Sequence, residues 1–275
     1  MRTLLAALLA LLAASALARA EESPRRIVSL NKCADQLLVS LVEPSRIGSV
    51  SPIAADDFAF MADVLARVPA NSGRGETILM EKGDFVLAGS FGTRPRMDLL
   101  RRQGFEVMTL DPWTSLADGQ RQIRSVAWRL GAEEAGERLV GRIDGALARA
   151  RRIAPPRTIL VLQHGGSTPG RDGMVSEILR AMGLVPYAER LGLPHGGRVS
   201  LERVVAAPPD YLLVPTADAG AAYDLGSAFL HHPALLDAVP PERRLTLAAR
   251  LSLCGGPATP VLIDALAAEV RARVR

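Results

Sequence analysis

The chain has 275 residues, of which 48% are hydrophobic and only 4% aromatic, and its formal net charge is +4. This length is enough for one large domain or two modest ones, each with its own core. Charges of both signs are interspersed and no basic run alternates with aromatic residues, so the sequence gives no case for a nucleic-acid partner.

The first twenty residues have the pattern of a secretory signal peptide. Arg2 is followed by a Leu/Ala stretch that ends in Ala18-Arg19-Ala20. The stretch is too short to span a bilayer comfortably, no comparable run follows it, and no Cys stands just behind it to carry a lipid. We expect cleavage near Ala20 and a soluble monomer in a Gram-negative periplasm, with 31 basic and 29 acidic residues left. An uncleaved anchor is the alternative.

Apolar runs and amphipathic stretches alternate through the first 111 residues. Strands are predicted at 25–30, 46–51, 84–89 and 105–111, and helices at 33–42, 56–68, 75–82 and 96–104. This rhythm predicts an α/β fold with a mainly parallel sheet.

A long, almost uninterrupted helical segment follows from Ser115 to about 153. Thr114 or Ser115 with Asp118 forms the predicted N-terminal cap, and Gly131 suggests a break. Strands and helices then resume, with a strand at 157–163, a helix at 174–183, a last strand before 250 and a closing amphipathic helix at 259–274. We therefore predict two lobes bridged by a single long α-helix: signal peptide 1–20, N-terminal lobe 21–114, linking helix 115–155 and C-terminal lobe 156–275.

One helix-and-strand pattern occurs twice. GETILMEKGDFVLAG (75–89) and SLERVVAAPPDYLLV (200–214) each place a Glu before an apolar run and an Asp eight positions after that Glu. Glu76 and Glu202 then head helices at equivalent positions of two related units. Chance is the alternative, although the strand-like runs RRIVSL and PRTILVL stand at similar distances upstream, which favours a repeat.

The sequence resembles a known family over nearly all of its mature length. The similarity lies in RIVSLNKCADQLLVSLVEPSRIGSVS (26–51), ETILMEKGDFVLAG (76–89), LERVVAAPPDYLLV (201–214) and LSLCGGPATPVLIDALA (251–267). These stretches resemble the periplasmic substrate-binding proteins of ABC importers for cobalamin, iron siderophores and haem. The resemblance implies two α/β lobes joined by one rigid helix, a bulky metal chelate bound between them with little hinge motion, and an ABC permease dimer of the inner membrane as partner. It implies no cofactor.

Ligands of open parallel sheets lie outside the carboxyl ends of the strands. The loops expected there, NKC, SFGTR, DPW, QHGGS and SLCGG, are rich in Gly and small polar residues, so backbone N–H groups can approach a ligand. The predicted ligand-binding residues are Asn31, Lys32, Cys33, Ser90, Phe91, Arg94, Trp113, His164, Gly165, Arg198, Cys254 and Gly255.

Several of these residues have two interpretations. The guanidinium groups of Arg94, Arg171, Arg198 and Arg250 either bind carboxylates or phosphate on the chelate or are simply solvated. Trp113 either stacks on a flat macrocycle or seals the edge of the N-terminal core.

Haem is an alternative to cobalamin or a ferric siderophore. Haem-binding relatives commonly use Tyr or His as axial ligand, and the resemblance makes this choice relevant here. Tyr187, Tyr211 and Tyr223 do not fall obviously on the predicted cleft loops, since Tyr211 belongs to a strand, whereas His164 does. A lone His after a strand is more often just a polar loop residue, so we do not prefer haem.

Cys33 and Cys254 are the only cysteines, and the resemblance places them on facing sides of the cleft. Three interpretations compete: a disulfide that ties the lobes, soft ligands that with His164 hold a metal, or two unpaired thiols. A close spacing such as CxxC is missing, so we favour the disulfide or the thiols and predict no metal site.

An enzyme is the rival class. HGGS at 164–167 is similar to the oxyanion loop of lipases and esterases, but an α/β-hydrolase needs a G-x-S-x-G elbow, which this chain lacks. It also lacks a P-loop, a complete GxGxxG and an HExxH. We therefore predict no catalytic activity.

The resemblance also gives the repeated Glu a role. In this family each lobe carries an exposed Glu that docks onto basic residues of the permease dimer, and by motif position these are Glu76 and Glu202. The permease dimer has near two-fold symmetry, so a two-lobed protein can contact both halves in the same way if each lobe carries an equivalent charged residue. The alternative is that each Glu only stabilises the start of its helix, where the helix dipole favours a negative charge. One Glu can have both roles.

Overall fold

The computed structural model describes residues 23–56, 58–90, 94–216 and 225–275, without the side chains of 94, 164 and 225–227. The predicted signal peptide, Phe91 and Tyr223 lie outside the described residues. Contacts divide the chain into two compact units. Unit 1 comprises the chain up to Ala54, Asp63–Leu110 and Gln122–Arg138, and unit 2 comprises Ala55–Ala62, Asp111–Arg121 and Leu139–Arg275.

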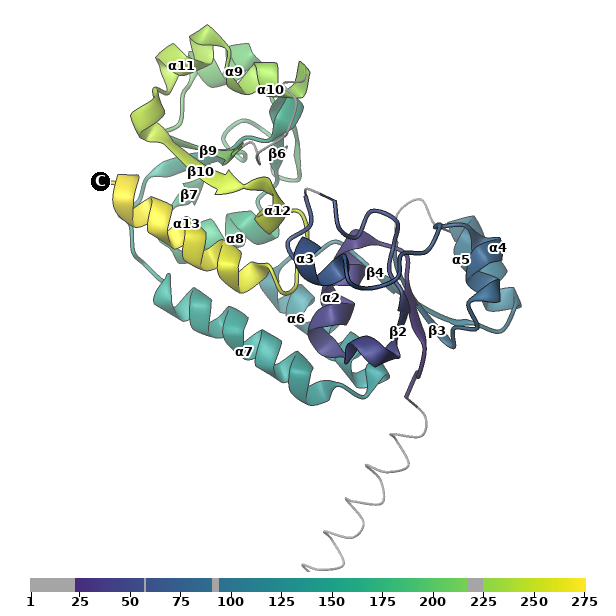
Figure 1. Cartoon of the computed structure of the whole chain (residues 1–275). Helices are drawn as coiled ribbons and strands as arrows, with labels where there is room; N and C mark the ends of the chain where they lie inside the picture. The colour runs from purple at the N-terminus through teal and green to yellow at the C-terminus, as the bar shows by residue number, and fades with distance from the viewer. Residues whose placement is uncertain (1–22, 57, 91–93, 217–224) are drawn as a thin grey trace, which may run out of the picture. The chain divides into compact units, whose positions relative to one another are not determined.

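Unit 1 is built on a four-stranded parallel sheet with the order β2-β1-β3-β4. The strands are β1 (Ile27–Ser29), β2 (Ile47–Ser49), β3 (Phe85–Gly89) and β4 (Glu106–Leu110). Helix α2 (Lys32–Leu41) lies on one face, and α4 (Gly75–Met80) and α5 (Arg94–Arg102) lie on the other (Figure 1). Because helices cover both faces, β3 is buried along its whole length. The four predicted strands of this half are confirmed.

The helix predicted over 56–68 is wrong in length. Among the described residues of this range, 56 and 58–68, the helix is limited to α3 (Ala62–Leu65). Asp56 makes a turn instead: its carboxylate accepts the backbone N–H of Phe58 at 3.1 Å, and its carbonyl accepts that of Ala59 at 2.9 Å. Asp competes in this way with helical hydrogen bonding, so turn chemistry outweighs the apolar pattern.

Unit 2 contains a second four-stranded parallel sheet, with the order β10-β9-β5-β7. Its strands are β5 (Thr158–Val161), β7 (Val185–Pro186), β9 (Tyr211–Thr216) and β10 (Arg244–Ala248). Helices α8 (Met174–Ala181) and α13 (Thr259–Arg273) cover one face, and α9 (Leu201–Ala206), α10 (Leu225–Leu230) and α11 (Pro233–Ala238) cover the other (Figure 1). The short α12 (Ala249–Ser252) follows β10.

A small antiparallel sheet in unit 2 escapes the sequence prediction. It pairs β6 (Ser167–Pro169) with β8 (Gly196–Arg198). The 3-10 turn η2 (His164–Gly166) leads into β6. Strands of three residues that contain Gly or Pro carry almost no periodic signal.

The two parallel sheets share one topology. Numbered along the chain within each unit, the strands stand in the order 2-1-3-4 in both. Helix α4 precedes the third strand of unit 1, and α9 precedes the third strand of unit 2. Glu76 and Glu202 are each the second residue of these six-residue helices. The predicted internal repeat is therefore confirmed as a repeat of structure.

The repeated Asp has a structural role in each unit. The Asp84 carboxylate accepts the backbone N–H groups of Arg25 and Arg26 at 2.7 and 3.0 Å. The Asp210 carboxylate accepts the backbone N–H and the hydroxyl of Thr158, both at 2.7 Å. Each Asp thus fastens the start of the third strand to the start of the first.

Replacing Asp210 with Asn should lower the stability of unit 2 in a pH-dependent way. The hydrogen bonds from Thr158 are the main cause that lowers the pKa of Asp210 below its usual value of 3.8. A lowered pKa means that the stabilisation is present above pH 3.8 and is lost as the pH falls below it. In urea unfolding, Asp210→Asn should cost about 1–2 kcal/mol at pH 6 and less at pH 3. An equal cost at both pH values would contradict this role.

The segment predicted as one long helix is two helices, α6 (Leu116–Leu130) and α7 (Glu133–Arg149). The break falls at Gly131, whose φ of 61° lies in the left-handed region that favours glycine. The break suggested at Gly131 is confirmed, so the predicted helical segment consists of two consecutive helices.

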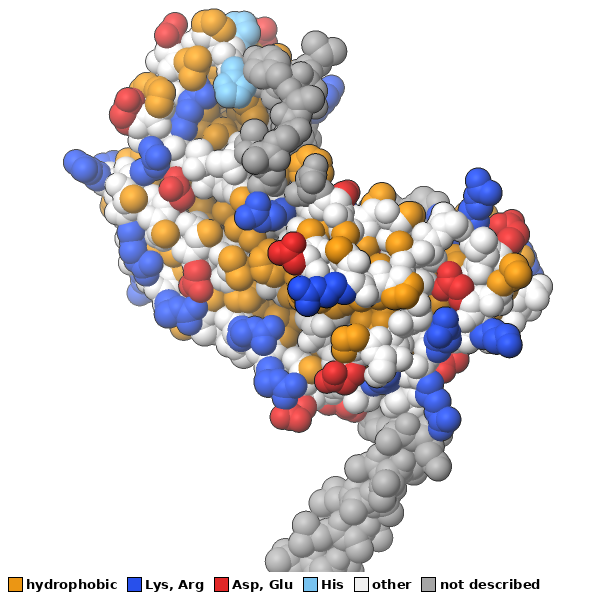
Figure 2. Space-filling view, viewed as in Figure 1, with side chains coloured by type: hydrophobic (Ala, Val, Ile, Leu, Met, Phe, Trp, Pro, Cys, Tyr) orange, Lys and Arg blue, Asp and Glu red, His pale blue; other side chains and the backbone are white. Residues whose placement is uncertain are grey.

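Within the described residues, no helix combines the length and the apolar character needed to cross a bilayer. The face of the molecule in Figure 2 shows Lys and Arg interspersed with Asp and Glu over both units. No continuous patch of one sign covers either unit on this face.

Candidate ligand-binding loops

The first candidate site of unit 1 lies where the strand order reverses. The chain runs from β1 to β2 on one side and returns to β3 on the other side of β1, and such switch points are where ligands bind in open parallel sheets. Asn31 and Ser90 follow β1 and β3 at this point. A β-carbon at Gly89 would lie only 2.7 Å from Asn31 Nδ2, so glycine lets the two loops approach. The structure thus brings these predicted residues together.

Asn31 also organises the start of α2. Its Oδ1 accepts the backbone N–H groups of Cys33 and Ala34 at 2.9 and 3.3 Å, as expected of an N-cap. Lys32 is buried at 8% exposure and Cys33 is half-buried. This turn is therefore a fixed element of the switch point.

A buried carboxylate beneath this turn escapes the sequence prediction. Asp35 is fully buried, and it accepts the backbone N–H of Ser51 at 2.9 Å and its hydroxyl at 2.5 Å. Burial, the largest effect, raises the pKa of Asp35 above its usual value, although hydrogen bonds from Ser29 and Ser51 and the charge of Lys32 oppose it. Asp35 fastens the loop after β2 to α2.

In unit 2 the structure joins Gly165 and Arg198. Gly165 has a φ of 64°, and a β-carbon there would lie 2.7 Å from Arg198 Nη2. Ser167 pairs with Arg198 across the β6–β8 sheet. The exposed Arg198 guanidinium therefore rests on the glycine turn that follows β5, one of the two central strands of the sheet. The side chain of His164, in the same turn, lies outside the described residues.

Trp113 packs closely against two glycines of unit 2. A β-carbon at either Gly119 or Gly255 would overlap the same three indole atoms, Cδ2, Cε2 and Cε3. Both glycines therefore lie in close contact with the same part of the indole ring. By its contacts Trp113 belongs to unit 2, and its stacking on a macrocycle stays a prediction. Its role here is to hold the turn that contains Cys254 and Gly255.

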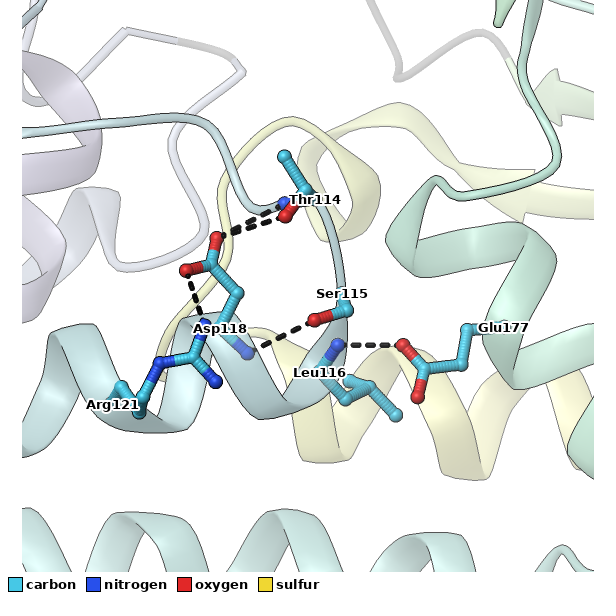
Figure 3. Close-up of polar contacts among 6 residues, drawn as sticks. All are labelled: Thr114, Ser115, Leu116, Asp118, Arg121 and Glu177. Carbon is cyan, nitrogen blue, oxygen red and sulfur yellow. Dashed lines mark hydrogen bonds and ion pairs between the residues drawn. The ribbon is translucent and has the colours of Figure 1, made fainter. Parts of the chain in front are cut away.

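The chain continues from Trp113 into the capped start of α6 (Figure 3). Ser115 Oγ accepts the backbone N–H of Asp118 at 3.0 Å, and the Asp118 carboxylate accepts the backbone N–H of Thr114 at 3.2 Å. Glu177 of α8 accepts the N–H of Leu116 at 2.6 Å. The predicted cap is confirmed, and Glu177 adds a contact that sequence spacing cannot reveal.

Gly119→Ala should destabilise the protein, because the added methyl group has no room beside Trp113. Overpacking of this kind costs about 1–3 kcal/mol. The matched control is Gly141→Ala in α7, where nothing lies within 4 Å of the added carbon and a gain of about 0.5–1 kcal/mol is expected. Chemical denaturation measures both. A neutral Gly119→Ala would contradict the clamp.

Both cysteines are disulfide-bonded, and neither is free. Of the three interpretations of Cys33 and Cys254, the structure supports the disulfide over unpaired thiols or metal ligands.

The remaining candidates differ in their surroundings. Tyr187 and Tyr211 are buried, and their hydroxyls bond to the backbone of Ala207 and Arg275 at 3.1 and 3.2 Å. Arg171 is paired with Asp172 and Glu189. Arg250 is exposed, and the side chain of Arg94 lies outside the described residues.

Two apolar side chains near these loops were missed. Ile53, in the loop after β2, is 53% exposed. The Phe229 ring of α10 lies against Gly166, where a β-carbon would be 3.1 Å from it. The sequence signal for Ile53 is a bulky residue in a loop of small and acidic ones directly after a strand.

The comparisons with known proteins agree with this architecture. The model of a periplasmic binding protein family matches residues 27–246. Among solved structures, the periplasmic heme-binding protein RhuT from Roseiflexus sp. RS-1 is 26% identical with a TM-score of 0.74, covering 91% of this chain and 99% of that one. No curated protein sequence matches significantly.

Two further structures share the fold at lower identity. A periplasmic heme binding protein from Pseudomonas aeruginosa is 21% identical with a TM-score of 0.71, covering 92% of this chain and 94% of that one. The periplasmic vitamin B12 binding protein BtuF of Vibrio cholerae is 17% identical with a TM-score of 0.68, covering 91% and 98%. The chain therefore belongs to the periplasmic binding protein family, as a substrate-binding component of an ABC importer.

Proposed function

We propose that this protein captures a metal chelate, cobalamin or a ferric siderophore, and delivers it to an ABC permease dimer. The observation that carries the proposal is the pair of parallel sheets with one topology, each with a polar loop at its switch point. Asn31 and Ser90 supply this loop in unit 1, and Gly165 with Arg198 supply it in unit 2.

These loops suit binding rather than catalysis. Small polar side chains and glycine backbone can approach a bulky ligand closely, and the exposed Arg198 guanidinium suits a carboxylate or phosphate on its rim. Ser167, the only serine of the HGGS motif, begins strand β6 rather than a strand-to-helix elbow. Hydrolysis of a p-nitrophenyl ester that disappears in Ser167→Ala would overturn this non-catalytic assignment.

Haem is the second candidate, because the similar proteins from Roseiflexus sp. RS-1 and Pseudomonas aeruginosa are heme-binding proteins. Tyr187 and Tyr211 are buried and bonded to backbone, so they do not suit an axial role. BtuF, which shares the fold, is a vitamin B12 binding protein.

Absorbance titration of the purified protein with cobalamin, haem and a ferric siderophore tests the proposal. We expect one of the three to bind, and Arg198→Ala to weaken a carboxylate-bearing ligand by about tenfold or more. Arg171→Ala is the matched control, since Arg171 is already paired with acidic residues. If none of the three binds at high micromolar concentration, the chelate assignment fails.

We further propose that Glu76 and Glu202 dock onto basic residues of the permease. Both are exposed and both occupy the second position of topologically equivalent helices. We also propose that the protein is exported with cleavage near Ala20 and that it is a monomer. We propose further that Cys33 is bonded to Cys254.

A further inference from the structure

The exposed face of α4 combines a charge with an apolar side chain. Glu76 and Met80 stand four residues apart and so share one face of the helix. Met80 is 81% exposed, whereas Ile78 and Leu79 pack into the core of unit 1. A thioether chain exposed to this degree makes little packing contribution to the fold of its own unit.

The equivalent face of α9 has a different composition. The position four residues after Glu202 is Ala206, and Arg203 beside Glu202 is also exposed. The pKa of Glu202 is lowered, first by hydrogen bonding to its own backbone N–H and to Ser200 and then by the charge of His232. The negative charge of α9 is thus partly offset locally.

The Glu76 carboxylate makes no hydrogen bond or ion pair with any residue of the described chain. Its charge is fully available to a partner. Charged contacts at an interface mainly set orientation and association rate, while buried apolar side chains supply much of the affinity, and Met is enriched among them. The two helices are equivalent in topology but not in what they offer a partner.

We infer that docking to the permease is unequal: the face of α4 formed by Glu76 and Met80 carries most of the affinity, and Glu202 mainly sets orientation. This inference rests on the docking function proposed above. The partner surface that fits α4 is a basic residue beside an apolar depression, whereas α9 needs a basic residue alone.

The experiment measures equilibrium binding of the purified, dye-labelled protein to right-side-out inner-membrane vesicles from cells that contain the permease. Met80→Ser and Glu76→Gln should each weaken binding by about tenfold, which corresponds to burying one side chain or losing one good charge pair. Glu202→Gln and the matched control Ala206→Ser should change it by less than about threefold. Val261→Ser, which removes another exposed apolar side chain on α13, should have no effect.

The outcomes separate this inference from the docking proposal. If Glu76→Gln and Glu202→Gln weaken binding equally, or if Met80→Ser stays within about threefold of wild type, the inference is wrong while docking stands. If neither Glu variant has any effect, the docking proposal itself fails. Circular dichroism of each variant checks that α4 and α9 remain folded.

Discussion

Transport of the chelate should be abolished when Glu76 and Glu202 are both replaced with Arg, while capture of the chelate by the purified protein should not change. Both carboxylates are exposed and stand at the amino-terminal ends of their helices, before the third strand of each sheet. The loops that we propose for the ligand lie at the carboxyl ends of the strands. Reversal places positive charge against the basic residues of the permease, and such like-charge contacts cost several kcal/mol each.

Uptake of labelled chelate into cells, together with stimulation of the permease ATPase, measures the loss. Glu43→Arg/Glu242→Arg is the matched control, because it reverses one exposed Glu in each unit away from α4 and α9. Uptake that survives the Glu76/Glu202 reversal would leave the repeated Glu with only a helix-start role. If the double variant loses affinity for the chelate as well as transport, the substitutions disturb the binding loops instead.

Removal of the disulfide should destabilise the protein more than Asp210→Asn or Gly119→Ala. If Cys33 and Cys254 are bonded to each other, the bridge closes a loop of more than 200 residues in the unfolded chain. Chain-entropy reasoning gives a loss of about 5 kcal/mol for such a loop. For a protein of this size the melting temperature should fall by on the order of 10 °C in Cys33→Ala/Cys254→Ala. Ala is the right replacement at 254, since that side chain is only 1% exposed.

Thermal unfolding with and without reductant provides the measurement. Reduced wild type should match the double variant, and the double variant should not respond to reductant. Digestion without reduction should yield one linked peptide pair that contains Cys33 and Cys254. Two thiols that alkylate freely in protein taken from the periplasm would contradict the bridge.

Most of the fold was predictable because its signals are local. The continuous apolar run 85–89 indicates a strand covered on both faces, and β3 has these bounds. Asp118 three residues after Ser115 predicts the cap of α6, and Gly131 predicts the break after it. Each prediction needs only a few neighbouring residues and the geometry of one helix or strand.

The parts that could not be predicted depend on contacts between distant segments. Asp35 has the sequence context of a solvent-facing carboxylate in an amphipathic helix, and only the fold brings Ser51 to it. The close contact between Trp113 and Gly255 likewise follows only from the fold. The loops of Asn31 and Ser90 could be predicted because ligands of open parallel sheets lie at the carboxyl ends of the strands. No such general rule predicts which residues contact Gly165 and Trp113.

The interleaving of the two units along the chain has a consequence for synthesis and for fragments. Unit 1 contains Gln122–Arg138, which include the buried side chains of Ile123, Val126 and Leu130 on α6. Arg46 near β2 donates a hydrogen bond to the Leu130 carbonyl at 2.7 Å. A nascent chain that has emerged only as far as β4 therefore lacks part of its own core, and a fragment cut after Thr114 should expose it. Completion of unit 1 must wait until α6 and the first turns of α7 are available, by which time the chain has already passed through a segment of unit 2.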